Sequence, residues 1–266
     1  MAKRLLRTGM SVLMAAALVA CGGGGGGGSG GGAPPDPQGG FSGTATRVGV
    51  PGSVDFDLLV LDDGTYYGFV GSDVPGAPDV EITAMLQGQG TVTGNVFTAT
   101  NGREFQFGAF DTLAGPDMPF YTARVDHAVS ASISAIGAAD SSFGRLTYSA
   151  AFQPAYNTPV PLADVAGNYI GSTRRLAGDQ AIAATITAGG ALTAVSGVCS
   201  ITGSLVQRPG GRRVFDLVVN YTAPTCALTG FSFTGVAFNS SPTNLILAGV
   251  LPDRSDALFA VLVKLP

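Results

Sequence analysis

The chain has 266 residues, of which 12% are charged, and it contains 40 glycines, 16 prolines and no tryptophan. Its formal net charge is −4, and no basic stripe that would bind phosphate runs through it, which excludes nucleic acid as a partner. Frequent glycine and proline, with many threonines, serines and valines, predict short strands separated by turns. We therefore expect an all-β fold with hardly any helix.

A basic and then apolar leader opens the chain. Three positive charges within the first seven residues precede an apolar run from Met10 to Ala20, which is the pattern of a secretion signal. The run is too short to cross a bilayer as a helix, which takes roughly 20 apolar residues. We predict a signal peptide over residues 1–20. Removing its three positive charges from −4 leaves −7 for the rest of the chain.

Cys21 follows Leu18-Val19-Ala20, and this pattern resembles the lipobox of bacterial lipoproteins. In those proteins the cysteine thiol receives a diacylglycerol group and the leader is then removed. The resemblance implies that Cys21 is the lipid-bearing first residue of the mature protein, with diacylglycerol and palmitate chains that together give stable membrane anchoring. The alternative is an ordinary secretion signal with a cysteine placed there by chance.

Residues 21–40 are expected to form a tether after the lipid. Gly22 to Gly32 is glycine except for Ser29, a composition that behaves as a flexible coil with an r.m.s. reach of about 18 Å. In enterobacterial lipoproteins an Asp directly after the cysteine retains the protein at the inner membrane. Because Gly22 stands there, the resemblance implies the outer membrane, on its surface or its periplasmic face.

An N-terminal β-domain is predicted over residues 41–153. Val54 to Leu58 alternates apolar and polar residues, as a half-buried strand does. Asp62-Asp63-Gly64 supplies a tight turn into the strand Thr65 to Val70. Further strands are expected at 90–98 and 104–110, paired through Asn101-Gly102, and within 121–136 and 146–152.

A proline-rich linker is predicted at residues 154–164, followed by a C-terminal domain over residues 165–266. Eight strands are expected there, at 167–175, 179–187, 191–197, 199–207, 212–221, 230–238, 244–251 and 257–265. This series favours an eight-stranded up-and-down barrel, whose interior is filled by side chains or holds one small ligand. A transmembrane barrel is the alternative. The lipid tether, the lack of aromatic girdles and the ending Lys264-Leu265-Pro266 count against it.

The second half repeats the plan of the first, which predicts a diverged duplication. Gly167-Asn168-Tyr169-Ile170-Gly171 echoes the start of the first domain near Phe41. Ala188-Gly189-Gly190 echoes the turn at Gly64, and Ser200 to Leu205 echoes Gly90 to Val96.

The sequence has three cysteines. With Cys21 assigned to lipid, Cys199 and Cys226 remain as a pair in an exported and oxidising setting, which favours a disulfide. A metal site or a reactive thiol is the alternative, but neither cysteine has a neighbouring histidine or CxxC spacing. We expect no cofactor and no metal.

The lipobox, the glycine tether and the repeated β-domains together resemble Gram-negative surface lipoproteins of the transferrin-binding-protein and factor-H-binding type. Those families carry an N-terminal β-domain and a C-terminal eight-stranded barrel, and they bind host proteins. The resemblance implies that fold and that class of partner. It assigns no binding residue in this sequence.

Catalytic candidates are few. His127 is the only histidine, and its neighbour Asp126 would point to the opposite face of a strand, so no Ser-His-Asp arrangement is indicated. Asp55 and Asp57 share one face of a strand and are followed by Asp62 and Asp63, but their spacing matches no calcium loop. We interpret them as a solvated acidic face.

Two surface features have alternative interpretations. Arg208, Arg212 and Arg213 flank a Pro-Gly-Gly turn, and a solvated hairpin tip is favoured over an anion site. Tyr66, Tyr67 and Phe69 would line a binding surface, but alternate members are expected to fill the core while Tyr67 lies outside.

The expected function is that of a non-enzymatic, membrane-anchored module. Residues 33–162 hold 13 acidic residues against four arginines, a charge of −9, whereas residues 163–266 carry +2. The acidic N-terminal domain is therefore the predicted site for an envelope or host protein, or a glycan. A carrier that holds a small ligand in the C-terminal lumen is the alternative, and an enzyme is a distant third.

Overall fold

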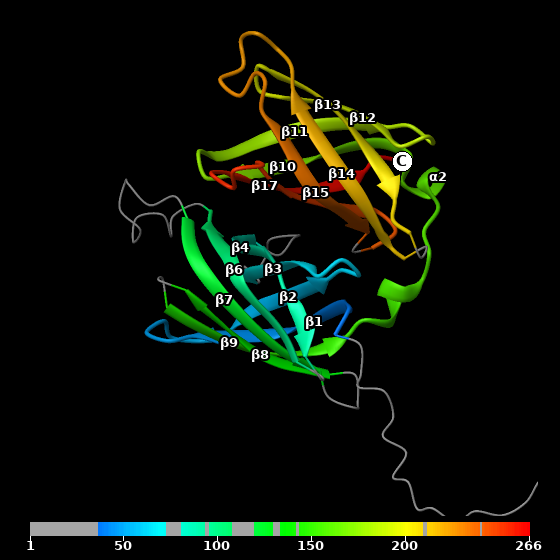
Figure 1. Ribbon diagram of the computed structural model, residues 1–266. Coiled ribbons are helices and arrows are strands. Elements are labelled where there is room, and N and C mark those ends of the chain that lie inside the picture. Colours follow the sequence, from blue (N-terminus) through cyan, green and yellow to red (C-terminus); the bar gives the residue numbers. More distant parts are fainter. Residues whose placement is uncertain are drawn as a thin grey trace, which may run out of the picture. The chain divides into compact units, whose positions relative to one another are not determined.

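The structure, a computed structural model, describes residues 37–72, 81–93, 96–107, 120–129, 134–141, 144–209, 212–239 and 241–266. Strands dominate these residues and form two closed antiparallel barrels of eight strands (Figure 1). The helical segments among them are a 3-10 turn, η2 (Pro154–Asn157), and a short helix, α2 (Leu162–Val165). No helix in the described ranges is long and apolar enough to cross a membrane. The expected all-β class is confirmed.

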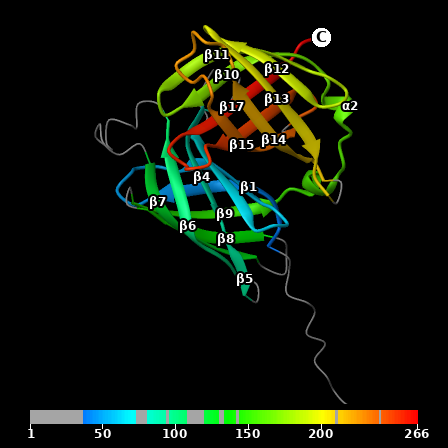
Figure 2. The same cartoon turned by 45° about the horizontal axis from the view of Figure 1, so that its top comes forward.

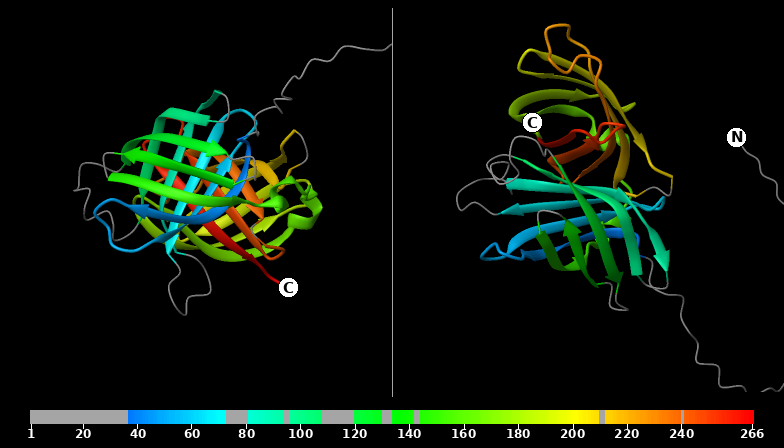
Figure 3. Two further views of the ribbon diagram at one scale, coloured as in Figure 1. Left: turned by 90° about the horizontal axis from the view of Figure 1, so that it is seen from below. Right: turned by 60° about the vertical axis from the view of Figure 1, so that its left-hand side comes forward.

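The first barrel is built from the N-terminal half of the chain. Its strands are β1 (Gly39–Arg47), β2 (Val54–Val60), β3 (Thr65–Ser72), β4 (Glu81–Gln89), β5 (Thr91–Thr93), β6 (Val96–Gln106), β7 (Phe120–Val129), β8 (Ser134–Ser141) and β9 (Gly144–Phe152). They follow the order β4-β3-β2-β1-β9-β8-β7-β6, and pairing of β4 with β6 closes the ring. The first and last strands, β1 and β9, lie side by side (Figure 3). The short β5 pairs with one end of β6 (Figure 2).

The second barrel has the simpler order. Its strands are β10 (Gly167–Arg175), β11 (Gly178–Ile186), β12 (Ala191–Ser196), β13 (Cys199–Gln207), β14 (Val214–Tyr221), β15 (Ser232–Asn239), β16 (Asn244–Val250) and β17 (Ala257–Lys264). Each pairs with the next in the chain, and β10 pairs with β17 to close the ring. The expected eight-stranded barrel is confirmed, with strand ends within about two residues of those predicted.

One turn recurs in both barrels, between β2 and β3 and between β11 and β12. Gly64 and Gly190 end this turn, with φ angles of 79° and 82° respectively. Both angles lie in the left-handed region, which glycine adopts at no steric cost. The carbonyl of Gly64 accepts a hydrogen bond from the Gly90 N–H at 2.9 Å, and that of Gly190 accepts one from the Leu205 N–H at 2.7 Å. This equivalence supports the duplication.

Two details of the expected pattern are wrong. Asn101-Gly102 is no turn, because Val96–Gln106 is one strand whose register shifts between Ala99 and Gly102. Asn-Gly therefore marks an irregularity of the kind seen at β-bulges. When the two barrels are aligned at this shared turn, Leu205 corresponds to Gly90. The segment Ser200 to Leu205 therefore corresponds to residues 85–90, and not to residues 90–96 as expected.

The two lumens are filled by different chemistry. Buried apolar side chains fill the C-terminal lumen, among them Phe215, Phe233 and Leu262. The N-terminal lumen has an apolar cluster as well, but it also contains an ion pair between Arg47 and Glu104, whose side chains are 8% and 1% exposed. A C-terminal lumen packed in this way counts against a carrier that would use it.

Candidate functional site

The barrels belong to one compact unit, Pro34–Pro266, and outward-facing residues of both form a shared apolar cluster, here called the inter-barrel cluster. It includes Leu59, Tyr67, Phe69, Met85, Phe105 and Phe107 of the first barrel and Val214, Val236, Ala248, Val250, Ala257 and Phe259 of the second. The Phe69 ring centroid lies 5.7 Å from that of Phe238 and 5.5 Å from that of Phe259. Burial of each such aromatic side chain contributes roughly 1.5–3 kcal/mol.

Tyr66 and Tyr67 alternate as predicted. Tyr66 lies inside the N-terminal barrel, and Tyr67 lies on its outer face. The outer face is not exposed at this point, because the inter-barrel cluster leaves Tyr67 only 3% accessible. Tyr67 and Phe69 therefore line an interface within the chain, and Tyr66 does not.

Arginines bind backbone carbonyls at the border of the inter-barrel cluster. Arg254 donates to the carbonyls of Gln87 and, at 2.6 Å, of Asn101. Arg103 of the first barrel donates to two carbonyls of the second barrel, those of Asp253, at 3.1 Å, and Arg254. Among the described residues other than glycine, Arg254 is alone in having a positive φ, of 57°. Such a conformation costs roughly 1–2 kcal/mol, which these hydrogen bonds offset.

Arg208 is the centre of an ion-pair network, so the predicted solvated hairpin tip is wrong. Its guanidinium lies 2.6 Å from Asp62 and 3.2 Å from Asp63 of the N-terminal barrel, and 2.5 Å from Asp216 on β14. The Arg208 side chain is 13% exposed. Burial opposes ionisation of Asp63, but hydrogen bonds from Thr65 and Arg208 outweigh it and lower the pKa of that carboxyl.

An open-sided cavity of about 270 Å³ lies beside the inter-barrel cluster. Its walls come from β1, β2 and β3, from the connection around η2, and from the β14 and β15 ends of the second barrel. The apolar part of the wall includes Leu59, Phe69, Tyr156, Val214 and Phe238. The size is near the lower end of ligand pockets, which measure about 300–1,000 Å³.

The polar groups of the cavity come from both barrels. Ser42 and Asp57 are direct partners on β1 and β2, and both line it. Burial among protein atoms is the main cause that raises the pKa of the Asp57 carboxyl; a hydrogen bond with Ser42 opposes it and the charge of Asp55 adds to it. Arg213 and Asn239 line the other side, one step beyond the pair Val214 and Phe238.

Arg213 and Asn239 each have a buried polar atom without a hydrogen-bond partner. These atoms are the guanidinium Nε of Arg213 and the amide Oδ1 of Asn239. The Arg213 backbone is fixed, because its N–H donates to the Tyr156 carbonyl at 3.1 Å. Buried polar groups are normally paired, and each unpaired one costs roughly 1–3 kcal/mol. Arg213 and Asn239 therefore keep unused hydrogen-bonding capacity beside the cavity.

Tyr156 holds the connection against both barrels. It is 5% exposed, and the Arg212 guanidinium lies 5.1 Å from its ring centroid. The Gln38 amide and the Val60 carbonyl each lie 3.5 Å from its hydroxyl. The cavity wall near Arg213 is therefore rigid.

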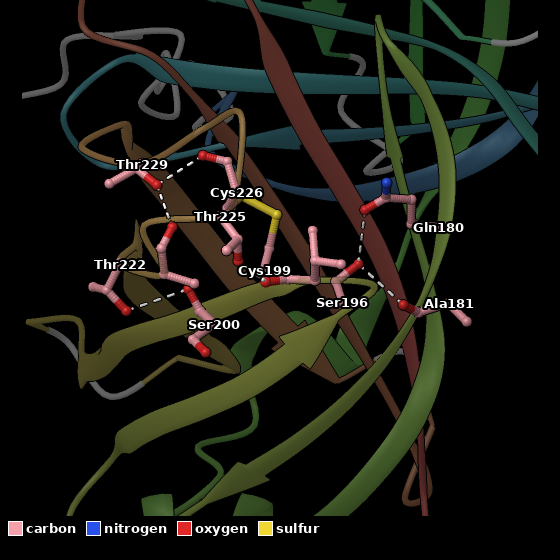
Figure 4. The surroundings of a disulfide bond; sticks show 11 residues. Gln180, Ala181, Ser196, Cys199, Ser200, Thr222, Thr225, Cys226 and Thr229 are labelled. Atoms are coloured by element: carbon pink, nitrogen blue, oxygen red, sulfur yellow. Dashed lines mark hydrogen bonds between the residues drawn. A yellow bond between two sulfur atoms is a disulfide. The ribbon is translucent and has the colours of Figure 1, made fainter.

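Cys199 and Cys226 form the expected disulfide, with their Cα atoms 4.8 Å apart. It joins the start of β13 to the loop between β14 and β15 (Figure 4). Around it the Thr229 hydroxyl donates to the Cys226 carbonyl at 2.7 Å, and the Thr222 hydroxyl donates to the Ser200 carbonyl at 3.3 Å. The disulfide closes one end of the second barrel, away from the residues that line the cavity.

His127 is a core residue of the first barrel. It is completely buried, its Nδ1 lies 2.9 Å from the Tyr148 hydroxyl, and its ring packs edge-on against Phe41 at 4.7 Å. Burial lowers the pKa of His127 to about 4. Asp126 faces outward as predicted and accepts a hydrogen bond from Thr98 at 2.9 Å.

The predicted acidic face is divided. Asp62 and Asp63 pair with Arg208, whereas Asp57 faces the cavity. Within the described ranges, no three His, Cys, Asp or Glu side chains converge to hold a metal ion. Leu18-Val19-Ala20-Cys21 and the tether up to residue 36 lie outside the described residues. The expected end of the tether at residue 40 is wrong, because Gly39 and Gly40 pair with β2 as part of β1.

Sequence reasoning missed the cavity and its key residues, Arg213 and Asn239. The turn-flanking position of Arg213 indicated a solvated tip, and Asn239 gave no signal. Alternation along β2 was the one available clue, because it sets Asp57 and Leu59 on the outer face together.

No family model and no curated protein matches this chain. Among solved structures, a protein of unknown function from Nostoc punctiforme is 10% identical, with a TM-score of 0.31, over 86% of this chain and 96% of that one. Isotype 1 transferrin-binding protein B from serogroup B Neisseria meningitidis is 9% identical, with a TM-score of 0.28, over 80% of this chain and 65% of that one. A candidate outer membrane protein from Bacteroides fragilis is 12% identical, with a TM-score of 0.26, over 86% of this chain and 98% of that one. Scores this low assign neither family nor function.

Proposed function

We propose that this chain is a lipoprotein of the outer membrane, anchored through acyl chains on Cys21. The motif Leu18-Val19-Ala20-Cys21 after a basic and apolar leader carries this proposal. The signal peptide ends at residue 20, a tether runs from Cys21 towards β1, which begins at Gly39, and the two barrels follow. The Cys199–Cys226 disulfide fits export to an oxidising compartment.

The anchored part serves as a non-enzymatic binding module for an envelope or host protein, or for a glycan. Two observations support this proposal. The only histidine is sealed in the core of the first barrel, where it cannot reach a substrate. The inter-barrel cluster fixes both barrels as one unit, and a preorganised surface loses little conformational freedom when it binds.

Lipidation is tested by labelling cells with palmitate. Wild-type protein should incorporate the label, lose its leader and sediment with outer membranes. A Cys21→Ser variant should remain unlabelled and unprocessed, whereas Ser29→Cys, which adds a cysteine within the tether, should behave as the wild type. Normal processing of Cys21→Ser would overturn the proposed anchor.

Binding is tested with soluble protein comprising residues 34–266, immobilised and exposed to envelope extracts and host fluids. A partner of the acidic first barrel should be retained at low salt and released as the ionic strength rises, because exposed charges are screened. A purified partner should then bind in a saturable manner. Failure of every fluid to yield a saturable partner contradicts the binding module without touching the anchor.

A further inference from the structure

The cavity beside the inter-barrel cluster has the composition of a ligand site. It combines an apolar wall with groups of opposite charge, Asp57 on one side and Arg213 on the other. Ligand sites characteristically combine apolar walls with a few polar groups that fix orientation. Asp57 is positioned by its pairing with Ser42 on β1 and Arg213 by the hydrogen bond from its N–H to the Tyr156 carbonyl, so the arrangement is built into the fold.

Neither charge is neutralised by its surroundings among the described residues. Arg47, Arg174, Arg175 and Arg208 each pair with a carboxylate, whereas no ion pair involves Arg213. The same holds for Asp57, whose pKa is raised mainly by burial among protein atoms and further by the like charge of Asp55. Asp57 is exposed and Arg213 is half-buried, so both charges can be reached from the cavity, and a ligand that supplies both counter-charges can form charge-assisted hydrogen bonds with them.

We propose that this cavity binds a small zwitterion, a free amino acid or short peptide with an apolar body. Its carboxylate accepts hydrogen bonds from the Arg213 guanidinium. Its ammonium group donates to the Asp57 carboxylate. The apolar body packs against Phe69 and Phe238.

This site is independent of the macromolecular partner proposed above. It also differs from a carrier that uses the C-terminal lumen, since that lumen is packed with side chains. A ligand here touches both barrels and the connection between them. The bound molecule would therefore stabilise the unit as a whole.

Calorimetric titration of residues 34–266 with the dipeptide leucyl-alanine tests the proposal. The dipeptide should bind in a saturable manner. N-acetylation removes its ammonium group and C-terminal amidation removes its carboxylate, and each should weaken binding about tenfold or more, as expected for loss of a charge-assisted hydrogen bond. Equal affinity for all three forms, or no saturable binding of the dipeptide, overturns the proposal.

Matched variants assign the two ends of the ligand. Asp57→Asn should weaken binding of the free dipeptide about tenfold but leave binding of the N-acetyl form unchanged. Asp55→Asn, on the same strand and outside the cavity lining, should change neither. Arg213→Gln should abolish discrimination between the free dipeptide and its amide, and Arg213→Lys should restore part of it. Arg145→Gln, at an exposed ion pair, is the control.

Circular dichroism of each variant separates loss of the site from loss of the fold. A folded Arg213→Gln protein that still distinguishes the dipeptide from its amide would refute the assignment of Arg213. If Asp57→Asn and Asp55→Asn weaken binding equally, the effect is a general one of charge and the assignment of Asp57 fails. Retention of the macromolecular partner should be unaffected by the dipeptide in every case.

Discussion

Burial of His127 predicts that acid destabilises the N-terminal barrel. In the folded chain the pKa of His127 is about 4, whereas an unfolded histidine has a pKa of about 6.5. The unfolded chain therefore binds the proton more tightly between these values. Stability from this group is complete above pH 6.5 and falls as the pH drops towards 4.

The size of the effect follows from linkage between protonation and folding. The pKa difference of about 2.5 units, at 1.36 kcal/mol per unit, sets a limit of roughly 3 kcal/mol. At pH 4.5 most of this amount is lost, roughly 2 to 3 kcal/mol relative to pH 7.5. Full burial of the ring means that solvent does not screen the effect.

Urea unfolding of residues 34–266 at pH 7.5 and pH 4.5 measures this loss of stability. Because the chain has no tryptophan, circular dichroism is the suitable signal. The matched variant His127→Gln keeps a neutral polar group opposite the Tyr148 hydroxyl and does not titrate. Other groups, Asp57 and Asp63 among them, titrate in both proteins and cancel in the comparison. If wild type and His127→Gln lose the same stability between the two pH values, the argument from burial is refuted.

Three further changes test the interior of the barrels. Gly137→Ala places a Cβ against the Tyr148 hydroxyl and the Asp126 carbonyl oxygen and should cost roughly 1–3 kcal/mol in urea unfolding; unchanged stability would mean that both Tyr148 and the β7 backbone shift freely. Glu104→Gln leaves the buried Arg47 without its carboxylate and should cost about 3–5 kcal/mol by the same measurement, so a loss below 1 kcal/mol would show that the ion pair is dispensable. Reduction of the disulfide, which closes a separation of 27 residues, should cost about 3 to 4 kcal/mol, and equal stability with and without reductant would argue against the chain-entropy account.

Local signals made the second barrel predictable. Alternation along β11 and β12 and the turn at Gly190 act over a few residues, and every strand pairs with its neighbour in the chain. The number of cysteines also made the Cys199–Cys226 pair predictable, because only two thiols remain once Cys21 is assigned to lipid. The lipid itself stays a prediction.

The first barrel was harder because its closure is less regular. Asn101-Gly102 is a strong hairpin signal in isolation, but β6 runs through it and pairs with β4, β5 and β7 in turn. The context of the neighbouring strands overrides the local preference. The strand β8 was merged with β7 for want of a turn signal between them.

The cavity was not predictable because it depends on contacts far apart in sequence. Asp57 and Arg213 are separated by more than half of the chain, and no local pattern links them. Tyr67 illustrates the same limit. Its outward position follows from alternation, but its burial follows only from the second barrel.

The uneven charge of the sequence acquires a structural explanation at the inter-barrel cluster. Asp62 and Asp63 supply carboxylates to Arg208, so part of the acidity of the first half and part of the basicity of the second serve to join the barrels. An acidic patch that binds a partner would need carboxylates that take no part in such ion pairs. Asp57 is one such carboxylate, and it faces a cavity too small for a protein surface. Part of the charge that sequence analysis assigned to recognition of a macromolecule thus serves to fix the two barrels and, by our proposal, to hold one small zwitterion.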